Sequence, residues 1–180
     1  MKTEHLVQFA LILAAYLRAR GIERPSIGLL NIGSEPIKGT SERRLAYHAL
    51  QTLHNPPFRF VGNIEGKSVF DGEVDGLVTD GFTGNVFLKT AEGIASLILD
   101  RLTTHIPADI LTQLTPHLVD LQRHLHYADY PGALLAGIKK IVIKCHGYST
   151  PQAIAKAVLG AADLISERFI DVFQEKLNSR

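Results

Sequence analysis

Two basic side chains stand in Gly-containing segments of the chain. Lys38 lies in Asn31-Ile32-Gly33-Ser34-Glu35-Pro36-Ile37-Lys38-Gly39, and His146 lies in Ile143-Lys144-Cys145-His146-Gly147. Glycine lets a backbone approach a ligand closely, and free N–H groups at a helix start favour an anion, as does an ammonium group. Histidine can move a proton or donate a hydrogen bond to an oxyanion. The two segments therefore indicate a site for an anion. The alternative interpretation is that Lys38 is an ordinary surface lysine and His146 a structural histidine.

A third segment, Asp80-Gly81-Phe82-Thr83-Gly84-Asn85, precedes a predicted helix. Its backbone amides could hold a phosphate group or a thioester oxygen. Asp80 could orient a cation or the histidine, and Asn85 could cap the helix. A further turn, with Asn63, Glu65 and Gly66, follows another predicted strand. By itself this turn does not indicate any particular ligand.

Other chemistries have little support in the sequence. It contains no Gly-x-x-x-x-Gly-Lys-Ser/Thr or Gly-x-Gly-x-x-Gly motif, which argues against nucleotide binding. His124 and His126 have no third ligand at a convincing spacing, so no metal is expected. The net charge of +1 gives no case for nucleic-acid binding. The single cysteine, Cys145, excludes an intramolecular disulfide and suits a reducing compartment; we interpret it as a buried thiol.

The elements that position these residues follow from the hydrophobic pattern. Strands are expected at residues 26–31, 58–62, 74–79 and 138–144, and helices at residues 4–20, from Thr40 or Ser41 to about 54, from about 85, and from Pro151 to beyond 172. Alternating strands and helices predict one α/β domain over residues 1–180, with a mostly parallel sheet covered by helices on both faces. Loops at the carboxyl ends of such strands share one crevice, where ligands bind.

Two helical segments have more than one interpretation. Residues 4–20 have helical spacing and are interrupted by Glu4 and Gln8, so a buried helix is favoured over a signal peptide. Residues 103–132 have no strand pattern and are divided by Pro107 and Pro116. They predict an insertion of one or two amphipathic helices, packed on the core or on a dimer mate, or forming a tip that touches a membrane or a partner.

Four ordered strings give the chain a family resemblance. They are Leu29-Leu30-Asn31-Ile32-Gly33 through Ile37-Lys38-Gly39, Phe60-Val61-Gly62-Asn63-Ile64-Glu65-Gly66, Asp80-Gly81-Phe82-Thr83-Gly84-Asn85 with Leu88-Lys89-Thr90, and Ile143-Lys144-Cys145-His146-Gly147. Together they resemble the phosphate acyltransferase family of bacterial phospholipid synthesis. The resemblance covers nearly the whole chain and is poorest over residues 103–132.

The resemblance implies transfer of a fatty acyl group from acyl carrier protein to inorganic phosphate, without an organic cofactor. It implies a homodimer in the cytoplasm, associated with the inner membrane face, whose product feeds a membrane glycerol-3-phosphate acyltransferase. The implied fold is similar to that of isocitrate dehydrogenase and phosphate acetyltransferase. The family's important lysine and histidine fall on Lys38 and His146. Other substrate-binding candidates are Asn31, Gly33, Gly39, Asn63, Glu65, Asp80, Gly81, Gly84, Asn85 and Lys144.

Two departures from the family keep alternatives open. Family members are close to twice this length, and their amino-terminal half is absent here, so the chain could be a fragment. Residues 130–137 also deviate from the family's Gly-Gly-Ala-Pro pattern. The alternatives are a phosphate acetyl- or butyryltransferase that uses coenzyme A esters, and a catalytically incomplete fragment for dimerisation or membrane docking. For an acidic carrier protein, the candidate basic rim is Arg43, Arg44, Lys67, Lys139 and Lys140.

Overall fold

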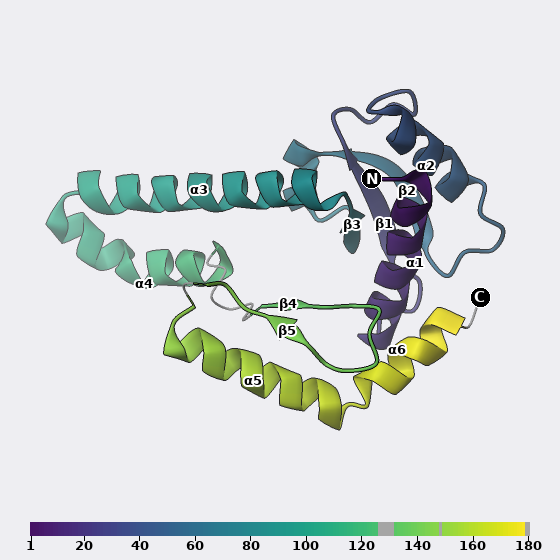
Figure 1. Cartoon of the computed structure of the whole chain (residues 1–180). Helices are drawn as coiled ribbons and strands as arrows, with labels where there is room; N and C mark the ends of the chain where they lie inside the picture. The colour runs from purple at the N-terminus through teal and green to yellow at the C-terminus, as the bar shows by residue number, and fades with distance from the viewer. Residues whose placement is uncertain (126–131, 148, 179–180) are drawn as a thin grey trace. The chain divides into compact units, whose positions relative to one another are not determined.

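The computed structural model describes residues 1–125, 132–147 and 149–178 of the chain (Figure 1). The chain divides into two compact units. The sheet unit comprises Met1–Thr83 and Ser166–Arg180, and the helix-rich unit comprises Gly84–Ile165. The expectation of a single domain over residues 1–180 stays a prediction.

The sheet unit is built on three parallel strands in the order β2-β1-β3 (Figure 1). They are β1 (Ser26–Asn31), β2 (Arg59–Glu65) and β3 (Gly76–Val78). The central strand β1 is buried along its whole length, as its continuous apolar run predicts. Leu29 is paired with Asn63 of β2 and with Val78 of β3. Because the strands are parallel, their carboxyl ends lie at the same edge of the sheet. The loop after β1, which carries Lys38, and the loop after β3, which carries Asp80, begin at this edge.

The predicted α/β class with a parallel sheet flanked by helices is confirmed. The strand β1 has the predicted bounds, and β3 is shorter than predicted. The strand β2 is longer than predicted, since it continues to Glu65 before the 3-10 helix η1 (Gly66–Asp71). Asn63 and Glu65 therefore belong to a strand, and their assignment to a strand-end turn was wrong.

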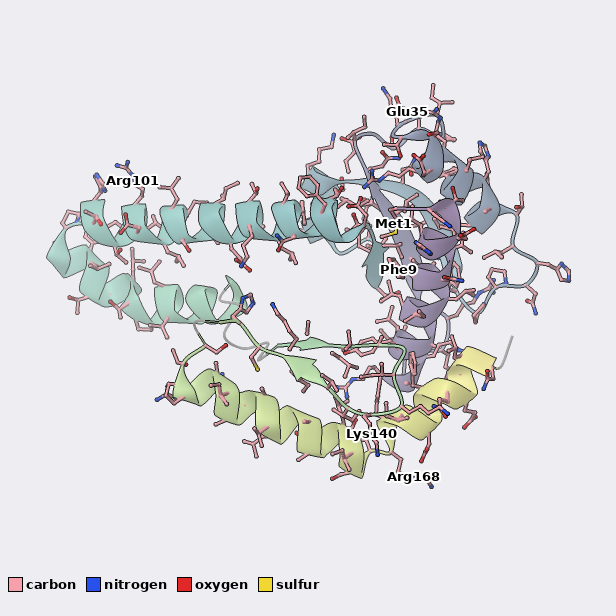
Figure 2. The ribbon with its side chains drawn as sticks, in the orientation of Figure 1. Met1, Phe9, Glu35, Arg101, Lys140 and Arg168 are labelled. Atoms are coloured by element: carbon pink, nitrogen blue, oxygen red, sulfur yellow. The ribbon has the colours of Figure 1, made fainter. Side chains whose placement is uncertain are left out.

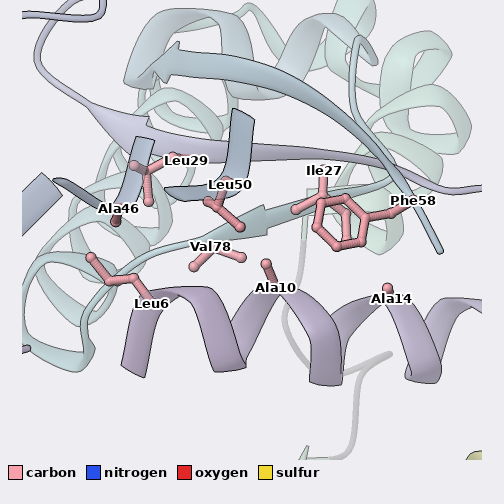
Figure 3. Packing of buried hydrophobic residues seen from close by; sticks show 9 residues of the cluster. All are labelled: Leu6, Ala10, Ala14, Ile27, Leu29, Ala46, Leu50, Phe58 and Val78. Atoms are coloured by element: carbon pink, nitrogen blue, oxygen red, sulfur yellow. The ribbon is translucent and has the colours of Figure 1, made fainter. Parts of the chain in front are cut away.

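Helices α1 (Thr3–Ala19) and α2 (Ser41–Gln51) pack on the sheet and on each other. The core that they share with the strands consists of Leu6, Ala10, Ala14, Ile27, Leu29, Ala46, Leu50, Phe58 and Val78 (Figure 3). Ala10 and Ala14 lie on the face of α1 turned toward the sheet, where their small side chains permit close approach (Figure 3). Burial of this apolar face against the sheet is the main interaction that stabilises α1 as a helix in the folded protein.

The helix α1 ends just before Gly21, close to the predicted end at residue 20, and the backbone explains why. Gly21 has φ +93°. Its N–H donates to the Arg18 carbonyl oxygen at 3.1 Å, and Ile22 N–H donates to the Leu17 carbonyl oxygen at 3.0 Å. These two bonds form a Schellman motif, which satisfies the last helical carbonyls.

The predicted long carboxyl-terminal helix is two helices, α5 (Pro151–Ser166) and α6 (Phe169–Asn178). The break contains Arg168 (labelled in Figure 2), whose φ of +52° a continuous helix does not allow. Its Nε donates to Asp171 Oδ2 at 3.1 Å. Within the sheet unit α6 packs on α1, where the rings of Phe169 and Tyr16 meet edge to face at 5.6 Å. The start of α5 is as predicted, because Ala153 N–H donates to Thr150 Oγ1 at 3.2 Å.

The helix-rich unit contains most of α3 (Gly81–His105) and of α5. It also contains α4 (Ala108–Leu125), β4 (Ala133–Leu134) and β5 (Ile143–Lys144). The helix α4 occupies much of the predicted helical insertion. It runs through Pro116, which was expected to divide the segment. Half-buried Leu111, Leu114 and Leu118 continue its apolar stripe across the proline. Residues 126–131 of that insertion lie outside the described part of the chain.

The prediction of a fourth strand of the parallel sheet at residues 138–144 was wrong. Of residues 138–144, only Ile143 and Lys144 form β5, and β5 pairs with β4 in an antiparallel ladder rather than with the parallel sheet. An isolated apolar run does not reveal its pairing partner, which is why the sequence pattern misled here.

The helix-rich unit leaves many apolar side chains in contact with solvent. Among its described residues, Ala157 is the one buried hydrophobic residue, with 5% of its surface exposed. Ile154, Val158 and Ile165, which fall at helical spacing on α5 (Pro151–Ser166), are exposed. No helix within the described ranges is both long enough and apolar enough to cross a membrane.

Candidate functional site

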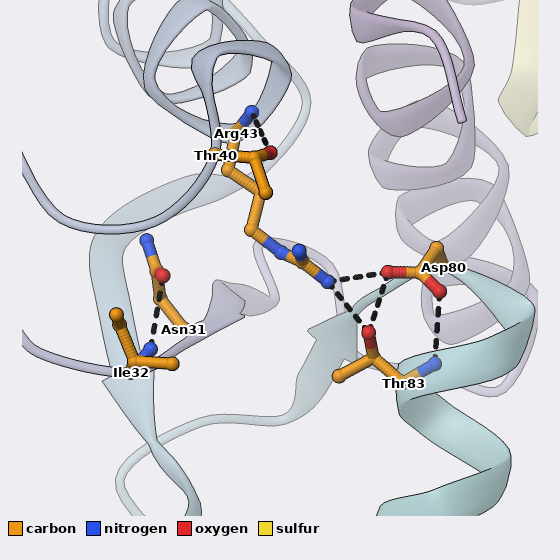
Figure 4. A network of polar contacts seen from close by, with 6 residues as sticks. All are labelled: Asn31, Ile32, Thr40, Arg43, Asp80 and Thr83. Carbon is orange, nitrogen blue, oxygen red and sulfur yellow. Dashed lines mark hydrogen bonds and ion pairs between the residues drawn. The ribbon is translucent and has the colours of Figure 1, made fainter.

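The loop between β1 and α2 carries Lys38 and is held by the side chain of Asn31. Asn31 ends β1 and is 8% exposed. Its Nδ2 donates to the Lys38 carbonyl oxygen at 3.1 Å, and its Oδ1 accepts from Ile32 N–H at 2.9 Å (Figure 4 shows the second bond). One buried amide therefore ties the first residue of the loop to the residue that carries the cation.

The glycines of this loop make room for its own side chains. Gly39 has φ +85°, and a Cβ there would lie 2.4 Å from Asn31 Oδ1. A Cβ on Gly33 would lie 2.8 Å from Glu35 Oε2 and 2.8 Å from Lys38 Cγ. A distance of 2.4 Å is far inside van der Waals contact, so Gly39 is required by the bonds of Asn31.

The ammonium group of Lys38 is available to an anion. Its side chain is 44% exposed, and its Nζ lies 3.9 Å from Glu35 Oε1. An exposed pair at this separation contributes little free energy. Glu35, the carboxylate nearest to Lys38, belongs to the same loop as Lys38 and lies beside α2 (Figure 2). An incoming phosphate group can therefore replace the carboxylate as the partner of Lys38.

Asn63 supports the same loop from the neighbouring strand. It is 5% exposed, and its Nδ2 donates to the Glu35 carbonyl oxygen at 2.9 Å. Its Oδ1 is buried and has no hydrogen-bond partner among the described residues. Glu65 ends β2 opposite Asn31, and its Oε2 lies 3.2 Å from Lys67 Nζ. The predicted candidates Asn31, Gly33, Gly39, Asn63 and Glu65 thus all adjoin the Lys38 loop or the strand ends that hold it.

A polar network joins the starts of α2 and α3 (Figure 4). Arg43, in the first turn of α2, donates from Nη2 to Asp80 Oδ2 and to Thr83 Oγ1, the second at 2.9 Å. Asp80 precedes α3 and accepts from Thr83 N–H at 2.8 Å and from the Thr83 hydroxyl at 2.7 Å. Asp80, rather than the predicted Asn85, therefore caps α3, and Asn85 lies inside the helix.

The network keeps Asp80 ionised. Burial by itself would raise the pKa of Asp80, but the hydrogen bonds from Thr83 and the charge of Arg43 outweigh it, so the pKa lies below its ordinary value. The side chains of Arg43 and Asp80 are 15% and 18% exposed, so water screens the pair weakly. Arg43 Nε is buried and has no hydrogen-bond partner among the described residues.

A pocket of about 400 Å³ opens beside this network within the sheet unit. Its lining combines apolar, hydroxyl and charged side chains, namely Met1, Leu6, Thr40, Glu42, Arg43, Asp80, Phe82 and Thr83. Arg43 is neutralised by Asp80. The other charges on the lining, the Glu42 carboxylate and the Met1 amino group, oppose each other. The Lys38 loop is therefore a better place for phosphate than this pocket, which suits an uncharged, partly apolar group.

Four candidates belong to the helix-rich unit. Gly84 and Asn85 lie in the first turns of α3, Lys144 is exposed on β5, and half-buried His146 follows β5. Because β5 is not a strand of the parallel sheet, the strand-end argument for His146 does not hold. The meeting of Lys38 and His146 in one site stays a prediction from the family resemblance.

Sequence reasoning missed Arg43 and Thr83. Arg43 was a candidate for the basic rim, but it is tied to Asp80; Arg44 donates from Nη1 to the Gly39 carbonyl oxygen at 2.7 Å. The capping pattern Asp80-x-x-Thr83 was present in the sequence and could have been read as a helix start. Its pairing with Arg43, 37 residues away, has no local signal.

Metal ligands do not gather in the part of the chain that the structure describes: no three His, Cys, Asp or Glu side chains there could hold one ion. His126, a candidate ligand in the sequence, lies outside the described residues.

The sequence pattern of one protein family, described as fatty acid synthesis protein, matches residues 1–172. A phosphate acyltransferase of Anoxybacillus flavithermus is 39% identical over 182 residues, which cover 98% of this chain and 54% of the relative. Phosphate acyltransferases of Chlamydia abortus and Campylobacter lari are 42% and 38% identical, over 92% and 99% of this chain and 48% and 55% of theirs. The chain thus spans about half the length of the curated relatives it matches.

Proposed function

Because the chain belongs to the fatty acid synthesis protein family, we propose that it transfers a fatty acyl group from acyl carrier protein to inorganic phosphate. The product is an acyl phosphate, a mixed anhydride that a membrane glycerol-3-phosphate acyltransferase can consume in phospholipid synthesis. The proposal includes a cytoplasmic homodimer that works at the inner membrane face. It rests on relatives named phosphate acyltransferase and on the Lys38 loop.

The observation that carries the proposal is the fixed loop around a partly exposed ammonium group. The carbonyl oxygens of Glu35 and Lys38 accept hydrogen bonds from the buried amides of Asn63 and Asn31. The loop is thus positioned before any ligand binds. Preorganised donors stabilise charge without a reorganisation cost at the moment of reaction. Lys38 would hold the phosphate dianion through charge-assisted hydrogen bonds.

In the proposed reaction an oxygen of hydrogen phosphate attacks the thioester carbonyl carbon. A C–O bond forms, the C–S bond breaks, and the proton of hydrogen phosphate ends on the released thiol. His146 is proposed to donate to the tetrahedral oxyanion or to protonate the departing sulfur. Loss of one such donor costs about 2.7–4 kcal/mol in the barrier. The reaction needs no covalent acyl-enzyme.

A second candidate function has an observation in its favour. The helix-rich unit exposes many large apolar side chains, including Ile94, Leu97, Ile98 and Leu159, and the chain spans about half of its relatives. A non-catalytic fragment that docks on a partner or a membrane would fit both facts.

The experiment incubates the purified chain with palmitoyl-acyl carrier protein and inorganic phosphate and traps acyl phosphate with hydroxylamine. We expect phosphate-dependent product, a loss of rate of about 100-fold or more in His146→Ala, and a loss in Lys38→Ala. Lys2→Ala is the control, because Lys2 also pairs with a nearby carboxylate, Glu4 at 3.5 Å. Palmitoyl-coenzyme A and acetyl-coenzyme A separate the carrier-protein reaction from the coenzyme A alternative. No product with any donor contradicts the proposal and favours the docking fragment.

A further inference from the structure

The Arg43–Asp80 pair connects two loops that leave neighbouring strands. Arg43 lies five residues after Lys38, in the first turn of α2 behind the loop that follows β1. Asp80 follows β3 and caps α3. Because β1 and β3 are adjacent, parallel strands, the loops leave the same edge of the sheet, and the guanidinium group bridges them (Figure 4).

The geometry of the pair differs from that of an incidental surface contact. One Arg43 nitrogen serves two acceptors, Asp80 Oδ2 and Thr83 Oγ1, while Asp80 uses both carboxylate oxygens. Every member also anchors a helix start: Arg43 N–H donates to Thr40 Oγ1 at 3.4 Å, and Thr83 N–H is capped by Asp80. The guanidinium group therefore ties the capped first turn of α2 to the residue that caps α3, and displacing it would release one helix start from the other.

The Lys38 loop depends on the same end of α2. Arg44 Nη1 holds the Gly39 carbonyl oxygen at 2.7 Å, and Asn31 holds the Lys38 carbonyl oxygen. A shift of the first turn of α2 would thus move Gly39 and, through it, Lys38. A misplacement of about 1 Å at a reacting group can cost up to about 100-fold in rate.

We infer that Arg43 and Asp80 are positioning residues that couple the Lys38 loop to the start of α3 without touching phosphate themselves. The inference rests on the proposed phosphate site for its functional consequence. The side chain of Arg43 is 15% exposed and paired with Asp80. That of Lys38 is 44% exposed, and its Nζ lies 3.9 Å from the nearest carboxylate oxygen of Glu35, which favours the anion at Lys38 rather than at Arg43.

The experiment compares Arg43→Met with Arg24→Met in the whole chain. Arg24 is exposed and precedes β1, at the end of the strand opposite to the Lys38 loop, so it is a matched loss of one guanidinium group. In the absence of phosphate, Arg43→Met should make hydrogen exchange of the Thr83 amide faster, and it should shift the amide resonance of Gly39. Arg24→Met should change neither the exchange rate nor the resonance. Unchanged exchange and resonance in Arg43→Met would overturn the coupling whether or not phosphate binds.

A charge swap distinguishes coupling from simple loss of folding. In phosphate titrations followed by NMR, Arg43→Met should raise the dissociation constant for phosphate by about 10-fold or more, and Arg43→Asp combined with Asp80→Arg should recover part of that loss. A double variant no better than the worse single variant would contradict the inference. If the unaltered chain binds no phosphate, the proposed function fails, while the exchange result still decides the coupling.

Discussion

Substitution of Gly39 tests whether the Lys38 loop is held as described. In Gly39→Ala the new Cβ would lie 2.4 Å from Asn31 Oδ1 and 2.9 Å from its Nδ2, at φ +85°. Positive φ costs an alanine about 1–2 kcal/mol. The clash adds to this, because Asn31 must leave its bonds to Lys38 and Ile32 and remain buried without partners, at about 1–3 kcal/mol. We expect a total destabilisation of about 2–5 kcal/mol.

The matched control is Gly72→Ala. Gly72 has φ +76°, and a Cβ there meets nothing within 4 Å, so this variant measures the backbone cost without the clash. Urea unfolding followed by circular dichroism, with hydrogen exchange of the β1 amides, gives the two free energies of unfolding. Gly39→Ala should be the less stable by about 1–3 kcal/mol. Equal losses would refute the account of the loop.

The remaining predictions concern the capping network and the core. Asp80→Asn should lower stability at neutral pH: the pKa of Asp80 is lowered in the folded protein, so its contribution is present above the unfolded value of about 3.9 and is lost as the pH falls through the folded pKa. The free energies of unfolding of Asp80→Asn and the original chain should therefore converge in acid, and a constant difference would contradict the assignment. Thr40→Ala should cost about 0.5–2 kcal/mol in thermal or urea unfolding, because Arg43 N–H loses its cap; no change would show that the cap is not formed. Phe58→Ala should cost about 3–5 kcal/mol, since Phe58 is fully buried in the core; a loss below about 1 kcal/mol would mean the core is packed differently.

Local signals predicted the scaffold of the sheet unit well. The apolar run Ser26–Asn31 predicted β1 with its observed bounds. The predicted helix start at Thr40 or Ser41, the start at Pro151 and the helix end near residue 20 agree with the observed caps. Each of these signals acts through neighbouring residues, so it can be seen in the sequence.

Errors arose where distant parts of the chain decide the outcome. The pairing of β5 with β4 depends on a second strand of two residues that has no pattern of its own. The break at Arg168 uses a left-handed residue that is not glycine, and Arg43 finds its partner at Asp80 across the sheet edge. Of the site, sequence reasoning brought Asn31, Gly39 and Lys38 to one loop, but it could not anticipate the inter-loop ion pair.

The most direct test of the central claim is phosphate binding by Lys38→Gln, measured by isothermal titration of the purified chain with inorganic phosphate. Loss of a charge-assisted contact of about 1.5–3 kcal/mol should weaken binding by about 10- to 150-fold. Lys2→Gln should bind as the original chain does. Equal affinity of Lys38→Gln and the original chain, or greater loss in Lys2→Gln, would contradict the claim that the loop after β1 holds phosphate through Lys38.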